Sequence, residues 1–94
     1  MPVLVRLPQA LAVDAAGETE LPIELGAGGT LGDLMSALRA QYPALARRLC
    51  DETGELRRFV NAYVGSDESR ALQGMATPIP EGTVILVAGS VAGG

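Results

Sequence analysis

The sequence predicts an α+β domain, in which a mixed sheet of four to five strands carries one main helix and a short second helix on one face. Segments with alternating apolar and polar residues, typical of half-buried strands, occur in both halves of the chain. Between them, apolar residues three and four positions apart are typical of a helix that packs on a sheet. At 94 residues, 48% of them apolar, the chain has the length and composition of one domain with one core.

The first two strands are expected at 3–7 and 19–25. In both segments every second residue is apolar, which places one face of each strand in the core. Pro22 lacks the N–H that a neighbouring strand would bind, and we therefore expect the second strand at an edge of the sheet. The connecting stretch VDAAGE carries the turn residues Asp14 and Gly17, so that the two strands form a hairpin with a long loop.

The stretch TLGDLMSALRAQY is expected to form the main helix. Thr30 is its predicted N-cap, and Asp33 completes a variant of the capping box in which Asp replaces Glu. One apolar stripe then follows the helix: Leu31, Leu34, Met35, Leu38 and Tyr42. Pro43 ends this helix or begins a second, short one, in which Leu45 and Leu49 lie four residues apart.

The remaining strands are predicted at 57–64 and 83–88, with a very short strand near Ala71–Leu72 inside a loop. Because the last strand is apolar at four consecutive positions, we expect it in the middle of the sheet, parallel to the first strand. The compact solution for this order of elements is the β-grasp, or ubiquitin-like, roll. Residues 1–88 would form that domain, and residues 89–94 a flexible tail ending in Gly-Gly.

Helices on one face leave the other face of the sheet open. That face would carry one alternate set of the last strand, either Ile85 and Val87 or Val84 and Leu86, together with Phe59 from the third strand. An apolar patch of this kind usually marks a partner surface, unless the loop 65–82 folds over it. We assign Phe59, Ile85 and Val87 to the partner contact.

The composition argues against an enzyme. The chain has no histidine and no lysine, which excludes His-based nucleophilic pairs, His-containing metal sites and a Walker A loop. Two carboxylate pairs stand in turn-rich stretches and are expected to be solvated loop charges: Asp51–Glu52 and Asp67–Glu68. We expect Cys50 to be packed as a small apolar residue. A net charge of −4 argues against nucleic acid and against an anionic membrane. Without a spanning run or a leader-like start, we expect a cytoplasmic protein.

The tail is the candidate working part. Six residues at about 3.3 Å each reach at most roughly 20 Å, enough to thread a narrow channel and present the α-carboxylate of Gly94. Without Cβ atoms, Gly93 and Gly94 leave the carbonyl carbon unhindered. The stretch GAGGTLG fails the GxGxxG pattern, so we expect no bound cofactor here and assign the use of ATP to a partner enzyme.

The whole chain resembles the ubiquitin-like sulfur carriers. The resemblance is carried by TLGDLMSAL, YPAL, RFVNAYV and GMATPIPEGTVILVAGSVAGG. The ending VAGG and the spacer DETGELRRFVN look most like the cysteine-type carriers, with the molybdopterin-type members close behind. Two positions depart from the family pattern: Gly82–Thr83 stands where Gly-Asp is common, and Gly89–Ser90 where many members have proline.

The resemblance implies a carrier rather than a catalyst. An E1-like adenylyltransferase would activate Gly94 as acyl-AMP, a sulfur donor would convert it to a thiocarboxylate, and a sulfur-accepting biosynthetic enzyme would use that sulfur. Gly93 would give access, and Val91 and Ala92 would help to seat the tail. The alternatives are a molybdopterin synthase small subunit, a ubiquitin-like protein modifier, and a β-grasp interaction module with an inert tail.

Overall fold

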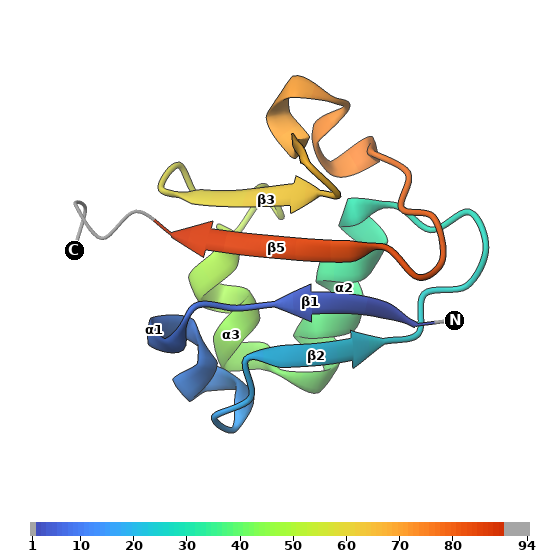
Figure 1. Cartoon of the computed structure of the whole chain (residues 1–94). Coiled ribbons are helices and arrows are strands. Elements are labelled where there is room, and N and C mark those ends of the chain that lie inside the picture. The colour runs from blue at the N-terminus through green and yellow to red at the C-terminus, as the bar shows by residue number, and fades with distance from the viewer. Residues whose placement is uncertain (1, 90–94) are drawn as a thin grey trace.

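The computed structural model describes residues 2–89, which form one five-stranded mixed sheet with the helices on a single face (Figure 1). The strands are β1 (Val3–Arg6), β2 (Glu20–Ile23), β3 (Val60–Val64), β4 (Asp67–Glu68) and β5 (Val84–Gly89). Their order across the sheet is β2-β1-β5-β3-β4. This is the β-grasp arrangement that the order of elements predicts.

The last strand lies in the middle of the sheet, as predicted. β5 runs parallel to β1, with Ile85 opposite Val5, and antiparallel to β3, with Val87 opposite Ala62. β1 and β2 form the expected antiparallel hairpin, and β2 is an edge strand in which Pro22 is exposed. The strand ends differ slightly from the prediction, because β3 begins at Val60 and β5 continues through Gly89.

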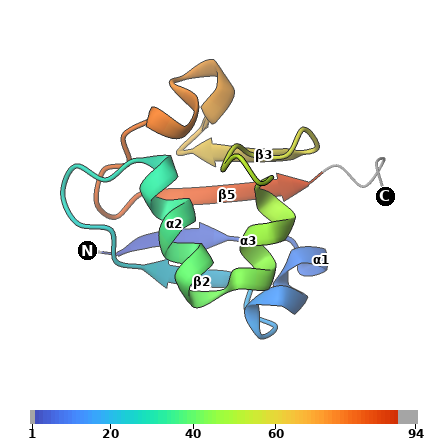
Figure 2. The same ribbon diagram turned by 180° about the vertical axis from the view of Figure 1, so that it is seen from behind.

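Two helices cover one face of the sheet, as Figure 2 shows from behind: α2 (Leu31–Gln41) and α3 (Pro43–Leu49). Both halves of the predicted capping box are present, since Thr30 Oγ1 accepts the Asp33 N–H at 3.2 Å and Asp33 Oδ2 accepts the Thr30 N–H at 3.0 Å. The predicted stripe is buried at Leu31, Leu34, Met35 and Leu38, and half-buried at Tyr42. Pro43 occupies the first turn of α3, where its missing N–H costs nothing.

The segment predicted as a long hairpin loop is instead helical. It contains α1 (Gln9–Ala12) and a 3-10 turn (Val13–Ala15). Arg48 of α3 fixes this segment, because its Nη1 donates to Ala10 O at 3.2 Å and to Asp14 Oδ2 at 2.9 Å. Four residues are too few to show a helical period in a sequence, and the helix depends on this tertiary contact.

The short strand predicted near Ala71–Leu72 is wrong. The outer neighbour of β3 is instead β4, with Asp67 opposite Val64, and Ala71 closes a 3-10 turn. The loop that follows reaches the helix side of the molecule, where Ile79 N–H donates to Gly29 O at 2.9 Å. Its first part lies beyond β3, and its last part passes the starting end of β5, so the loop does not lie across β5 or β1 (Figure 1).

Candidate functional site

The predicted tail residues Val91, Ala92, Gly93 and Gly94 lie outside the residues that the structure describes. The last described residue, Gly89, pairs with Val60 at the start of β3. The chain therefore leaves the sheet at this end of the β3–β5 pair. Within residues 2–89, no helix is long and apolar enough to cross a bilayer.

The assignment of Ile85 and Val87 to the partner surface is wrong. Both side chains are buried, at 0% and 2% exposure, in the core beneath the helices. Their sheet neighbours Val5 and Ala62 are also fully buried. A strand that is apolar at every position carries no alternation, so its sequence does not reveal which set faces the helices. The other set considered, Val84 and Leu86, is the one that faces away.

An apolar patch does lie on the face of the sheet turned away from the helices. Leu86, at its centre, is 45% exposed. The register places Val84 beside Leu4, and Leu86 between Arg6 and Tyr63. We call the following residues the open-face patch: Leu4, Tyr63, Val84, Leu86 and Ala88. All but Leu86 are half-buried, so every member of the patch stays accessible, as expected for a docking surface.

Phe59 is accessible, as its assignment to the partner contact requires. Its side chain is 46% exposed, in the turn that precedes β3. It directly precedes Val60, the partner of Gly89, so an exposed aromatic ring stands beside the point where the tail leaves. Aromatic side chains at such positions are frequent anchors in protein interfaces.

Charged pairs border the open-face patch on both sides. On one side, Arg6 Nε lies 3.2 Å from Glu20 Oε2. On the other, Arg70 Nη1 lies 2.9 Å from Asn61 Oδ1 and 3.4 Å from Glu68 Oε2. Exposed pairs of this kind add little to stability, but they restrict how a partner can be oriented on the patch.

The glycine-rich stretch before α2 has a structural explanation. A Cβ on Gly29 would lie 2.5 Å from Leu25 Cγ, and Gly26 and Gly28 have φ of 78° and 80°. Gly29 also accepts the N–H of Ile79 through its carbonyl oxygen. These glycines let the chain turn closely from β2 into α2.

Cys50 is packed in the core, as predicted, at 3% exposure. Burial raises the pKa of its thiol, an effect that the nearby Arg39 guanidinium opposes. The group is therefore held as the neutral thiol and is not an activated nucleophile. Within residues 2–89 there is no cluster of three or more His, Cys, Asp and Glu side chains that could hold a metal ion.

Known proteins match both the sequence and the fold. The chain is 36% identical over 96 residues to the sulfur carrier protein CysO of Mycobacterium tuberculosis, across 100% of both chains. The crystal structure of that CysO matches with a TM-score of 0.80 and 35% identity, covering 95% of this chain and 99% of that one. The Amycolatopsis orientalis BexX/CysO complex contains a chain that matches with a TM-score of 0.83 and 26% identity, covering 98% and 99%.

A third relative is the small archaeal modifier protein 3 of Haloferax volcanii, 33% identical over 81 residues, which covers 86% of this chain and 87% of that one. No family model matches the sequence. The β-grasp sheet and these relatives define a ubiquitin-like carrier protein. Because the similarity to CysO spans the full length of both chains, the chain belongs to the CysO family of sulfur carriers.

Proposed function

We propose that this protein carries sulfur as a thiocarboxylate on Gly94 and acts as a co-substrate in a cysteine-type or related thiolation pathway. The observation that carries the proposal is the full-length similarity to CysO, combined with a chain that ends in Gly93–Gly94. The absence of histidine and lysine from the sequence agrees with a protein on which other enzymes act. We place these reactions in the cytoplasm, where ATP is abundant.

The chemistry requires two steps at one carbon atom. In an E1-like partner, a carboxylate oxygen of Gly94 attacks the α-phosphorus of ATP, which releases pyrophosphate and forms the acyl-AMP. A sulfur nucleophile then attacks the carbonyl carbon, and AMP leaves. Glycine at the last two positions keeps this carbon open to attack. A second enzyme transfers the sulfur to a small molecule, and hydrolysis restores the carboxylate.

Docking on the open-face patch would hold the domain while the tail enters a partner's active site. Leu86 is the most exposed side chain of the patch, and Phe59 beside the end of β5 would add an aromatic contact. Val91 and Ala92 would seat the tail in the channel. The related Amycolatopsis orientalis CysO forms a complex with BexX, which supports docking of this kind by the present chain.

The mass of the intact protein tests the proposal. After incubation with ATP, sulfide and the cognate activating enzyme, we expect the gain that corresponds to one oxygen replaced by sulfur. A chain lacking Gly94 is the matched control and should show no gain. If the intact chain is never charged, and the shortened chain supports the host pathway equally well, the proposed function is wrong.

Protein modification is a second candidate, favoured by the 33% identity to small archaeal modifier protein 3. In that role Gly94 would form isopeptide bonds with lysines of other proteins. The chain has no lysine and cannot form lysine-linked chains of itself. Adducts of higher mass that contain this chain in cell extracts, and that disappear when Gly94 is deleted, would support it.

A further inference from the structure

The seven arginines divide into two groups. Arg6, Arg48 and Arg70 each form an ion pair with a carboxylate. The other four form no such pair within residues 2–89: Arg39, Arg47, Arg57 and Arg58. In a chain with a net charge of −4, unpaired cations gathered in one region need an explanation. Three of these four line a single cavity.

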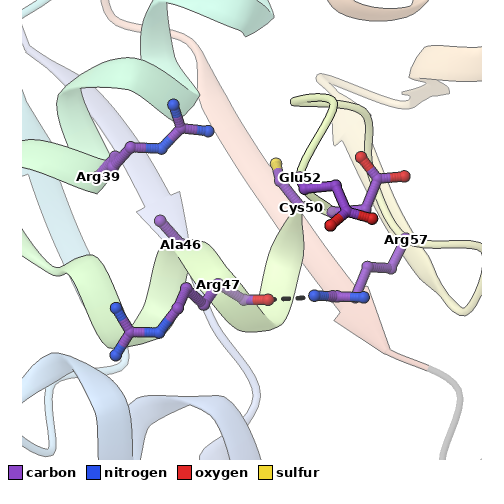
Figure 3. Close-up of a pocket in the computed structure, with 7 residues that line it drawn as sticks. Arg39, Ala46, Arg47, Cys50, Glu52 and Arg57 are labelled. Atoms are coloured by element: carbon purple, nitrogen blue, oxygen red, sulfur yellow. Dashed lines mark hydrogen bonds between the residues drawn. The ribbon is translucent and has the colours of Figure 1, made fainter.

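The cavity has a volume of about 330 Å³ and lies among the ends of α2 and α3 and the segment that leads to β3 (Figure 3). Arg39, Arg47 and Arg57 line it, together with Ala46, Cys50, Asp51 and Glu52. This volume is at the lower end of the range for ligand pockets, and it exceeds what a single small ion needs.

The two carboxylates neutralise only part of the positive charge of the cavity, because its lining has three guanidinium groups and two carboxylates. Oδ1 of Asp51 is used within its own turn, where it accepts the N–H groups of Thr53 at 2.9 Å and Glu55 at 3.3 Å. The side-chain hydrogen bond from Thr53 and its backbone N–H lower the pKa of Asp51. Glu52 adds a second negative charge, against three guanidinium groups in the lining. One of these is already fixed, because Arg57 Nε donates to Arg47 O at 3.0 Å.

The arrangement fits several separate carboxylates better than one phosphate. A helix N-terminus is a ready-made phosphate site, because its backbone N–H groups are free to donate. Here Arg39 and Arg47 stand in the last turns of α2 and α3, where the backbone presents carbonyl groups. Figure 3 shows the guanidinium groups of Arg39 and Arg47 directed to different sides. Such donors suit carboxylates spaced along one peptide segment.

The cavity lies close to the point where the tail leaves the domain. Arg57 directly precedes the turn that carries Phe59, and Val60 pairs with Gly89. In Figure 2 the segment after α3 leads to the start of β3, beside the end of β5. An enzyme that holds the tail must cover this end of the molecule. We propose that the arginine-lined cavity docks an acidic peptide segment of a partner enzyme that receives the tail, an inference that rests on the proposed function.

Nuclear magnetic resonance of the arginine side chains tests this inference. Acetylated, amidated hexaglutamate is the probe, at about 20 mM salt, where the Debye length is roughly 20 Å. We expect it to shift the Nε–H signals of Arg39 and Arg57, whereas hexaglutamine should not. Arg39→Gln and Arg57→Gln should each weaken binding by about threefold. Arg58→Gln removes the same charge one residue from Arg57 but outside the cavity, and it should leave binding unchanged.

Three results would overturn the inference. Hexaglutamine could bind as tightly as hexaglutamate, Arg58→Gln could weaken binding as much as Arg57→Gln, or inorganic phosphate could displace the peptide at a lower concentration. Because Arg57 also donates to Arg47 O, Arg57→Gln could weaken binding by destabilising the fold, and the thermal unfolding of each variant is therefore measured. Arg39→Gln loses no described hydrogen bond and serves as the second variant. A chain lacking Gly93–Gly94 should bind the peptide normally. A failure of tail charging is therefore distinguishable from a failure of the cavity to bind the acidic peptide.

Discussion

Leu86 lies directly opposite Tyr63 across the antiparallel β3–β5 pair, on the face of the sheet turned away from the helices. The next residue toward the start of the strand, Ile85, is fully buried beneath those helices, whereas Leu86 is 45% exposed. Two adjacent aliphatic residues of one strand therefore have different roles. Ile85 belongs to the core, and Leu86 is available to a partner.

Alanine substitutions at these neighbours should separate the roles by stability. Ile85→Ala leaves a cavity in the core and should lower the free energy of unfolding by about 2–5 kcal/mol. Leu86→Ala should change it by about 0.5 kcal/mol or less, as is usual at exposed positions. Urea unfolding at neutral pH measures both. Equal losses would contradict the assignment of Leu86 to the open face.

A charge at the centre of the open-face patch should disrupt docking without unfolding the domain. We expect Leu86→Lys to raise the KM for this carrier in charging by the activating enzyme by about tenfold, or about 1.4 kcal/mol, which is more than most interface side chains contribute. Val13→Lys is the matched control, because Val13 is 69% exposed and lies outside the patch. Similar KM values for the two variants would mean that the activating enzyme does not use this face.

Removal of the capping box should destabilise α2. Thr30→Ala deletes the oxygen that accepts the Asp33 N–H, and we expect it to lower the free energy of unfolding by about 1 kcal/mol. Ser36→Ala, at an exposed position within the helix, is the control and should not destabilise. Circular dichroism during thermal unfolding measures both. Retention of wild-type stability in Thr30→Ala would show that the cap contributes nothing.

Cys50 should make stability depend on alkaline pH. Burial raises the thiol pKa in the folded state, so the unfolded chain loses this proton first. The contribution of the neutral thiol to stability is fully present below the pKa of the thiol in the unfolded chain, about 8.5. It is lost as the pH rises from there through the pKa of the thiol in the folded protein. Urea unfolding from pH 7 to about 9.5 should show stability falling with pH. The Cys50→Ala variant should be less stable than the wild type at pH 7, but its free energy of unfolding should fall less between pH 7 and about 9.5. If it falls as much as in the wild type, Cys50 is not the source of the pH dependence.

Much of the fold could be predicted because the deciding signals are local. The stripe from Leu31 to Leu38, the capping box at Thr30, and Pro22 in an edge strand each follow from a few neighbouring residues. The helical segment at 9–15 and the pairing of Asp67–Glu68 were missed. Both segments are too short for a periodic pattern. The first is fixed by Arg48, which is distant in sequence, and the second pairs with Val64 and Tyr63 across the tight turn at 65–66.

The sequence alone predicted that Gly93 and Gly94 are the working end of the protein, because two glycines need no fold to be identified. It also determined the order of elements that gives the β-grasp sheet. Only the tertiary structure decided which side chains of β5 face away from the helices and which arginines share a cavity. The physical reason is that a central strand apolar on both faces carries no alternation. In the same way, charges separated along the chain are brought together only by the packing of α2, α3 and the segment that leads to β3.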